Sequence, residues 1–279
     1  MQLVLRLIAR LPLSFLHALG TLLGWTIYGM SPTYRRHLRE NLAAAGLDDA
    51  RVRRGAVAAA GQMVMELPAI WFRRHDEVVA LVKSVEGAEA AYESQRSGKA
   101  LLFLTPHMGA FEIASLYAAR EMPITVLYRR PKVGWTEPLM RAGRERANVR
   151  LVPADLTGVR AMFAALKRGE PVGFLPDQVP GKGEGEWAEF FGRPAYTMTL
   201  AAKLAERNNV ACFLAFARRL PRGEGYSLHV RPLPSPIEGE SATRRINRAL
   251  ESLVRECPEQ YLWGYNRYKI PAGAPRPPA

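Results

Sequence analysis

From residue 100 onward, short apolar runs alternate with stretches of helical periodicity, and this alternation constrains the fold more than any other feature. Six runs have the length and composition of strands: 100–104, 124–128, 150–152, 171–175, 210–217 and 226–230. Helix-like stretches lie between and after them: 110–120, 135–147, 156–167, 197–208 and 241–256. Such alternation is typical of an α/β fold with a mostly parallel sheet flanked by helices, and the turn-forming sequence at 221–225 predicts a hairpin at one edge.

The first 30 residues are strongly apolar, and helices are also expected at 34–45 and 51–72. The uncharged run 11–30 is about long enough to cross a bilayer, although Pro12 and three glycines interrupt it. Basic residues flank the run on both sides, so they do not set an orientation. A spanning helix, a helix lying on the cytoplasmic face of a membrane and a buried core helix all fit this pattern.

The sequence therefore predicts three parts. Residues 1–30 form a membrane anchor or interfacial helix, residues 31–270 form the main domain, and residues 271–279, rich in Pro and Ala, form a flexible tail.

The charge balance indicates an anionic partner. The chain of 279 residues holds 39 Lys and Arg against 26 Asp and Glu, a formal net charge of +13. Charge of this sign favours a lipid surface, a nucleic acid or an acidic protein. No zinc-finger spacing, RNP-type aromatic motif or bZIP pattern is present, so no nucleic acid is expected as a partner. The two cysteines, Cys212 and Cys257, suggest neither a metal site nor a disulfide framework, so we expect a reducing compartment.

A histidine follows the first strand-like run, in Thr105-Pro-His-Met-Gly-Ala-Phe-Glu112. If a helix starts near Gly109, Glu112 lies in its first turn and can reach His107 on the preceding loop. The carboxylate would accept the Nδ1 proton and hold the tautomer whose Nε2 takes a proton from a substrate hydroxyl. The alternative is a buried histidine with an ordinary hydrogen-bond partner.

The position of other polar residues favours the catalytic interpretation. In open α/β sheets, ligands collect at the carboxyl ends of the strands. Five residues follow predicted strand ends directly: His107, Arg129, Arg130, Pro153 and Asp177.

Several reaction classes lack their motifs in this chain. The sequence has no Gly-x-Ser-x-Gly elbow, no His-Glu-x-x-His and neither of the common glycine-rich phosphate loops, and its five histidines are scattered singly. We therefore expect no metal and no cofactor. A base without a protein nucleophile beside it indicates direct activation of an acceptor hydroxyl, which acyl transfer from a thioester requires.

Six segments of the chain together resemble one family. In chain order they are Thr105-Pro-His-Met-Gly-Ala-Phe-Glu112, Val126-Leu-Tyr-Arg-Arg-Pro131, Arg144-Glu-Arg146, Gly158-Val-Arg160, Gly173-Phe-Leu-Pro-Asp-Gln178 and Phe190-Phe-Gly-Arg-Pro-Ala195. This order resembles the bacterial lipid A biosynthesis (lauroyl/myristoyl) acyltransferases. They belong to the lysophospholipid and glycerolphosphate acyltransferase superfamily, whose signature is His-x4-Asp/Glu. The resemblance runs from Tyr34 to Lys269.

The resemblance implies a glycerolphosphate-acyltransferase-like fold and an enzyme at the cytoplasmic face of the bacterial inner membrane. Such an enzyme moves a fatty acyl chain from acyl carrier protein, or from acyl-CoA, to a hydroxyl of an anionic lipid acceptor, here a lipid A precursor. Residues 31–270 would then be the acyltransferase domain. Alternatives within the class are a lysophospholipid or ornithine-lipid acyltransferase. A thioesterase-like hydrolase and a non-catalytic lipid-binding protein are the alternatives outside it.

The resemblance also implies roles for individual residues. His107 becomes the general base, with Glu112 as its partner. Arg144 would bind an acceptor phosphate or stabilise developing negative charge, and Asp177 would position a basic side chain or an acceptor hydroxyl, unless it only caps its loop.

Four further residues are candidates for contacts with the substrates. Arg129 and Arg130 are candidate contacts for the anionic headgroup, with a solvated rim as the alternative. Phe190 and Phe191 line an acyl channel or belong to the core.

Overall fold

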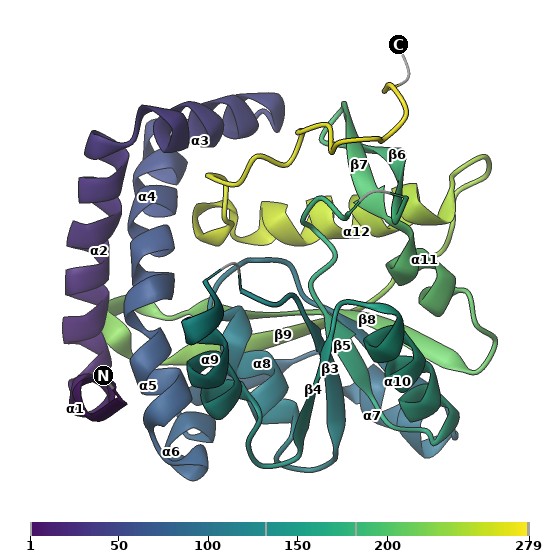
Figure 1. Cartoon of the computed structure of the whole chain (residues 1–279), viewed down its shortest axis with the longest axis horizontal. Helices are drawn as coiled ribbons and strands as arrows, with labels where there is room; N and C mark the ends of the chain where they lie inside the picture. The colour runs from purple at the N-terminus through teal and green to yellow at the C-terminus, as the bar shows by residue number, and fades with distance from the viewer. Residues whose placement is uncertain (1, 132, 182, 278–279) are drawn as a thin grey trace.

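A seven-stranded sheet forms the centre of the fold, in a computed structural model that describes residues 2–131, 133–181 and 183–277 (Figure 1). The strands lie in the order β1-β9-β8-β2-β5-β3-β4. Their bounds are Val82–Glu86 for β1, Ala100–Leu104 for β2, Ile124–Tyr128 for β3, Val149–Pro153 for β4, Val172–Phe174 for β5, Val210–Arg219 for β8 and Tyr226–Pro232 for β9. All neighbours from β8 to β4 are parallel, which confirms the α/β fold with a mostly parallel sheet.

The predicted hairpin exists, but its place in the sheet was predicted wrongly. β8 and β9 are antiparallel, and the short 3-10 helix η2 (Pro221–Gly223) lies between them. The hairpin is not at the edge, because β1 pairs in parallel with β9 and lies outside it. The pattern missed β1 because three of its five residues, Lys83, Ser84 and Glu86, are polar and exposed. It also missed a separate two-stranded sheet, formed by β6 (Gly185–Phe190) and β7 (Arg193–Met198).

Helices cover both faces of the sheet, and alternate residues of β2 show this. Leu102 and Leu104 point into the core beneath α10 (Leu156–Lys167), α11 (Thr199–Ala205) and α12 (Ala242–Glu256). Leu101 points to the opposite face. That face carries α7 (Glu89–Arg96), α8 (Phe111–Ala118) and α9 (Glu137–Arg144). The 3-10 helix η1 (Gly134–Thr136) directly precedes α9.

The N-terminal helices form a layer at one end of the sheet (Figure 1). They are α1 (Gln2–Ala9), α2 (Leu13–Met30), α3 (Pro32–Ala44), α4 (Ala50–Met65), α5 (Leu67–Phe72) and α6 (His75–Val79). α2 and α4 lie side by side and pack through glycines. A Cβ on Gly61 would collide with the carbonyl oxygen of Gly20, so this contact requires glycine. The α2 glycines thus allow two backbones to approach closely.

The expected helix at 51–72 is broken in two at Glu66. Proline cannot donate the backbone hydrogen bond of a continuing helix, and Pro68 lies in the first turn of α5. The break leaves Glu66 almost fully buried between the two helices.

Among the described residues, one segment is long and apolar enough to cross a membrane, or two if a bent pair of helices counts as one span. One is Ala50–Phe72, of which 39% of the most apolar window is buried inside the protein, and the other is the pair of α1 and α2, bent by 111°. The cores of soluble proteins contain helices with the same properties.

At the other end of the chain, residues 271–277 form neither helix nor strand, and Trp187 donates a hydrogen bond to the carbonyl of Pro275 at 2.9 Å. Residues 278–279 of the predicted tail lie outside the described residues.

Candidate functional site

The loop between β2 and α8, residues 105–110, crosses the carboxyl edge of the sheet, and other elements bond its backbone. The N–H of Gly109 donates to the carbonyl of Gln260 at 3.0 Å, and Leu262 donates to the carbonyl of His107 at 3.0 Å. Gly109 has a φ of +58°, and a Cβ there would collide with the carbonyl oxygen of Ala217 on β8. The glycine is therefore required for the loop to lie against β8.

His107 is held by a buried aspartate that follows the neighbouring strand β5. Its Nδ1 lies 2.8 Å from Oδ1 of Asp177, and its backbone N–H donates to Oδ2 at 2.9 Å. Burial by itself raises the pKa of Asp177, but the charge and hydrogen bonds of His107, together with the charge of Arg267, hold this pKa below its usual value. Asp177 is therefore a carboxylate, which can only accept hydrogen bonds.

The tautomer of His107 follows from this contact. Because Asp177 can only accept, Nδ1 carries the proton, and in the neutral ring Nε2 carries the lone pair. The side-chain amide nitrogen of Gln178 lies 3.1 Å from Nε2 and donates to it. The His107 side chain is 19% exposed, against 3% for Asp177, so the ring is accessible while its partner is buried.

Glu112 lies in the first turn of α8, as predicted, but it does not accept the Nδ1 proton. Its carboxylate pairs with Arg144 of α9, with 2.7 Å between Nε and Oε2 and a second bond from Nη2 to Oε1. Trp71 of α5 donates to the same Oε2 at 3.2 Å. The first turn of α8 directs Glu112 toward α9 and α5, whereas Asp177 follows β5, the strand beside β2. Asp177 therefore occupies the position that the spacing of the sequence gave to Glu112.

The other predicted contacts separate into those that line a pocket and those that do not. Arg144 lines the pocket beside His107, and its pairing with Glu112 raises its pKa, although burial alone would lower it. Arg129 also lines the pocket and is exposed. Arg130 is absent from the lining; its side chain is 65% exposed and lies 4.0 Å from a carboxylate oxygen of Asp155.

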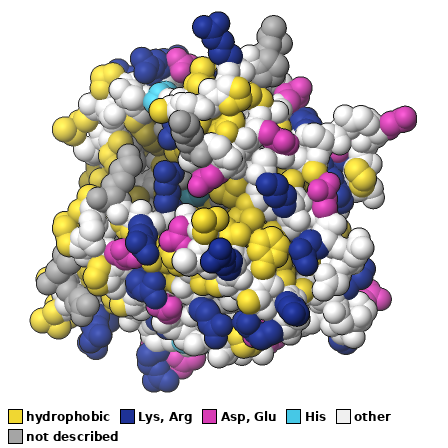
Figure 2. All heavy atoms as spheres, turned by 45° about the vertical axis from the view of Figure 1, so that its right-hand side comes forward, with side chains coloured by type: hydrophobic (Ala, Val, Ile, Leu, Met, Phe, Trp, Pro, Cys, Tyr) yellow, Lys and Arg dark blue, Asp and Glu magenta, His cyan; other side chains and the backbone are white. Residues whose placement is uncertain are grey.

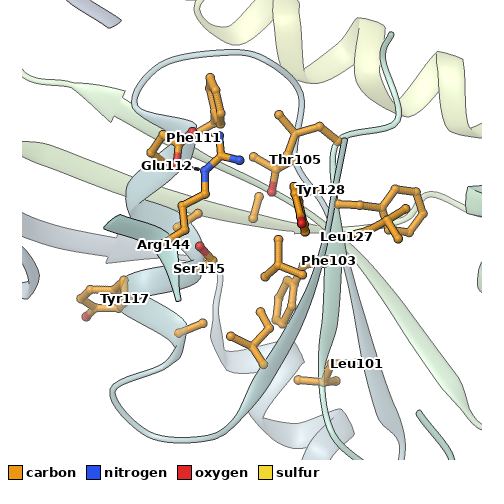
Figure 3. A pocket seen from close by; sticks show the side chains of 18 of the residues that line it. Leu101, Phe103, Thr105, Phe111, Glu112, Ser115, Tyr117, Leu127, Tyr128 and Arg144 are labelled. Atoms are coloured by element: carbon orange, nitrogen blue, oxygen red, sulfur yellow. Dashed lines mark hydrogen bonds and ion pairs between the residues drawn. The ribbon is translucent and has the colours of Figure 1, made fainter. Parts of the chain in front are cut away.

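The pocket is an apolar cavity of about 480 Å³ between the sheet and α7 and α8. The lining includes His107, Gln178 and Arg129, which follow strands at the carboxyl edge of the sheet. From Thr105 at this edge the cavity extends to Leu101 near the start of β2 (Figure 3). At roughly 3.3 Å per residue, Leu101 and Thr105 are about 13 Å apart along the strand. Apolar side chains of the sheet line the wall: Leu101, Phe103, Ile124, Val126, Leu228 and Val230. The cavity can take a long apolar chain with one end near His107.

Figure 2 shows one face of the molecule, on which hydrophobic side chains lie in a hollow and many Lys and Arg side chains surround it. A basic surrounding of this kind attracts anionic molecules.

Phe190 and Phe191 do not line this cavity. Both are buried in the core on the other face of the sheet, where their rings lie 4.8 Å apart. Of the two readings of this motif, the structure supports plain core.

Some residues of the site were not singled out from the sequence. Gln178 follows Asp177 in a motif that was noticed, but nothing in the sequence shows that its amide faces His107. Trp71 lies 41 positions before Glu112, so no local pattern connects them. Among the described residues, no group of three or more His, Cys, Asp or Glu side chains is placed to hold a metal ion.

The fold and the pocket together define an α/β protein with an accessible histidine at the mouth of an apolar cavity. The family model for bacterial lipid A biosynthesis acyltransferases matches residues 1–270, and the chain belongs to this family. It is an acyltransferase of lipid A biosynthesis.

Three characterised relatives come from Escherichia coli K12. The chain is 28% identical to the lipid A biosynthesis lauroyltransferase over 223 residues, 77% of this chain and 71% of the relative. It is 26% identical to the palmitoleoyltransferase over 279 residues, 95% and 89% of the two chains. It is 27% identical to the myristoyltransferase over 187 residues, 64% and 56% of the two chains.

Proposed function

We propose that this protein transfers a fatty acyl chain from a carrier thioester to a hydroxyl of a lipid A precursor, with His107 as general base and Asp177 as the residue that orients it. The observation that carries the proposal is the lone pair of Nε2 at the mouth of an apolar cavity, where it accepts from the amide of Gln178, with Nδ1 fixed by Asp177. A base held in one tautomer is ready to take a proton from an alcohol.

The reaction is a direct transfer. Nε2 of His107 takes the proton of the acceptor hydroxyl, and the oxygen attacks the thioester carbonyl. The tetrahedral intermediate collapses, the carbon–sulfur bond breaks, and His107 returns its proton to the leaving thiolate. Gln178 gives up its hydrogen bond to Nε2 when the acceptor hydroxyl arrives, and the cavity holds the acyl chain out of water.

The Glu112–Arg144 pair contributes a polar wall beside the base. Both side chains line the cavity, and that of Arg144 is the more exposed, 23% against 6% for Glu112 (Figure 3). We assign Arg144 to the acceptor phosphate or to the developing negative charge, and Glu112 to holding Arg144 in place. Arg129, also exposed at the cavity, serves the anionic headgroup or the acidic carrier protein.

The protein would work at the cytoplasmic face of the bacterial inner membrane, with α1 and α2 lying in the membrane surface. The outer face of these helices exposes large apolar side chains, with Leu3 72%, Leu22 66% and Trp25 41% exposed. α1 also carries Arg6, and exposed apolar residues combined with basic ones are typical of interfacial helices. Tryptophan is enriched at membrane interfaces.

The catalytic proposal is tested by the products. The purified protein is given acyl carrier thioester, with and without a lipid A precursor, and lipids are read by mass spectrometry. We expect an acylated lipid only when the acceptor is present, and its loss in His107→Ala. Equal release of free fatty acid with and without acceptor would identify a hydrolase instead. Lipid binding without any product would identify a non-catalytic binder, and the same assay with acyl-CoA decides the donor.

Membrane placement is tested by flotation with anionic phospholipid vesicles. Burying one leucine contributes about 1.5–3 kcal/mol, so Leu22→Glu should weaken vesicle binding by roughly tenfold or more. Ile237→Glu is the matched control, because Ile237 is 56% exposed in the loop before α12, away from α2. Equal loss in both variants would contradict the placement.

A further inference from the structure

A second ionic cluster lies outside the pocket, between the N-terminal layer and the end of β8. Glu66, in the break between α4 and α5, accepts two hydrogen bonds from Arg219, Nε to Oε2 at 2.9 Å and Nη2 to Oε1 at 2.6 Å. His17 of α2 and the hydroxyl of Tyr226 of β9 each lie 3.0 Å from Oε2. These four residues, here called the helix-layer cluster, are all buried.

The cluster reaches the loop that carries His107. Nη2 of Arg219, which bonds Glu66, also donates to the carbonyl of Gly109 at 2.7 Å. Gly109 is two residues from His107. In the part of the chain that the structure describes, two side chains bond the backbone of loop 105–110: Asp177 at the N–H of His107 and Arg219 at Gly109.

The side chain and the backbone of Arg219 are each held by a neighbouring residue. Glu66 fixes its guanidinium, and Gln260 fixes its backbone, accepting from the N–H at 2.8 Å and donating to the carbonyl at 3.1 Å. Gln260 also accepts the N–H of Gly109 through its carbonyl. Both polar groups of the Gly109 backbone are therefore bonded within one small unit, and the loop has little freedom to shift.

We propose that Arg219 is a positioning residue for acyl transfer: held by Glu66 and, through it, by His17 of α2, it anchors Gly109 and so keeps His107 in register with Asp177 and the cavity. This inference rests on the proposed role of His107 as the base. It also makes the packing of α2, the helix with the exposed apolar face, a condition for an ordered catalytic loop. A buried ion pair on its own adds little net stability, which leaves room for a positional role.

The test compares substitutions within the cluster. Arg219→Lys keeps the charge, but one ammonium cannot replace the fork that bonds Glu66 twice and Gly109 at once. Displacement of a catalytic group by about 1 Å can cost roughly a hundredfold in rate, so we expect kcat to fall between about tenfold and a hundredfold, with KM within roughly threefold. Tyr226→Phe removes a bond to Glu66 without touching Gly109, and it should lower kcat much less than Arg219→Lys does. Arg218→Lys, at an exposed neighbouring position, controls for the substitution itself.

A second measurement separates positioning from general loosening. Hydrogen–deuterium exchange should rise by about tenfold in peptides covering 105–112 in Arg219→Lys, with the sheet core unchanged, because local opening is read segment by segment. Unchanged kcat and exchange in Arg219→Lys would overturn the proposal, as would an equal fall of kcat in Tyr226→Phe. If Arg219→Lys does not fold, Glu66→Gln takes its place, and unchanged exchange of 105–112 there overturns the proposal as well. Exchange needs no substrate, so it tests the anchor even if the wild-type protein transfers no acyl group.

Discussion

A histidine, a carboxylate and an arginine come together in two places in this molecule. At the pocket mouth, His107 is bonded to Asp177, and the guanidinium of Arg144 lines the same cavity. In the helix-layer cluster, His17 and Arg219 share Glu66. The residue types are the same, but the surroundings differ.

Access and spare hydrogen-bonding capacity distinguish the two groups. The side chain of His107 is 19% exposed, and its Nε2 faces only a displaceable amide, whereas Nε2 of His17 is already bonded to Glu66 in a side chain 8% exposed. None of the residues of the helix-layer cluster lines the apolar cavity. The two groups therefore contain the same residue types, and only the group at the cavity can meet a substrate.

The largest expected effect is a matched pair of histidine substitutions. General-base catalysis contributes roughly 10²–10⁴-fold, so His107→Asn should lower kcat by about that factor. His17→Asn removes a histidine of the other cluster, which has no path to substrate, and should lower kcat by less than about tenfold. Acyl transfer by both proteins, assayed beside their urea unfolding curves, checks the pair. Comparable losses of kcat would show that access does not separate the two clusters.

The next largest effect is expected on the free energy of unfolding, when Glu66 loses its charge. Removing one partner of a buried ion pair leaves the other charge unpaired, so Glu66→Gln should destabilise the fold by about 3 kcal/mol at neutral pH. Burial alone would raise the pKa of Glu66, but Arg219 and His17 hold this pKa below its usual value of 4.5. A folded-state pKa below the unfolded one means that ionised Glu66 stabilises the fold above pH 4.5, and that this contribution is lost as pH falls through the lowered pKa.

The wild-type protein should therefore lose stability below pH 4.5 more steeply than Glu66→Gln. Urea unfolding followed by circular dichroism across this range measures the difference. Glu112→Gln is the comparison at the pocket mouth, where the partner Arg144 is 23% exposed and water can solvate a lone guanidinium. If the free energy of unfolding falls equally with pH in the wild type and in Glu66→Gln, Glu66 is not the source of the loss of stability.

A smaller effect is expected for the residue that orients the base. Asp177→Asn keeps the shape but permits the other tautomer of His107, so kcat should fall by about a hundredfold, within the range of general-base effects. KM should change little, because Asp177 is buried behind His107. Glu112→Gln acts through Arg144 at the cavity wall and should raise KM for the acceptor more than it lowers kcat. The reverse pattern in steady-state assays would return the orienting role to Glu112.

This division between Asp177 and Glu112 also marks how far the sequence could lead. The strand-like runs, the helix at 156–167 and the placement of His107 and Asp177 after strands could all be predicted, because period and apolar composition are local properties. The partner of His107 could not. Glu112 is near in sequence, whereas Asp177 is near only because β5 lies beside β2, and a single sequence does not contain the strand order.

The same reasoning applies to the helix-layer cluster. Pro68 indicates a break in the helix at 51–72, because proline cannot donate the backbone hydrogen bond of a continuing helix. The approach of Arg219 to that break, 153 residues later, depends on the packing of the whole N-terminal layer against the sheet.

The smallest expected effect separates two neighbouring arginines that the sequence treated alike. Arg129 lines the cavity, and Arg130 is 65% exposed beside Asp155. Exposed ion pairs contribute about 0–1 kcal/mol, so Arg130→Ala should leave both kcat and KM within roughly twofold. Arg129→Ala removes a charge facing the anionic partner and should raise one KM by about threefold to tenfold, since charges at a rim act mainly on association. The effect should shrink as salt is added, because screening weakens such a contact. Varying the concentrations of donor and acceptor separately shows which of them Arg129 contacts. Equal KM values in Arg129→Ala and Arg130→Ala would show that Arg129 has no role in binding beyond that of its exposed neighbour.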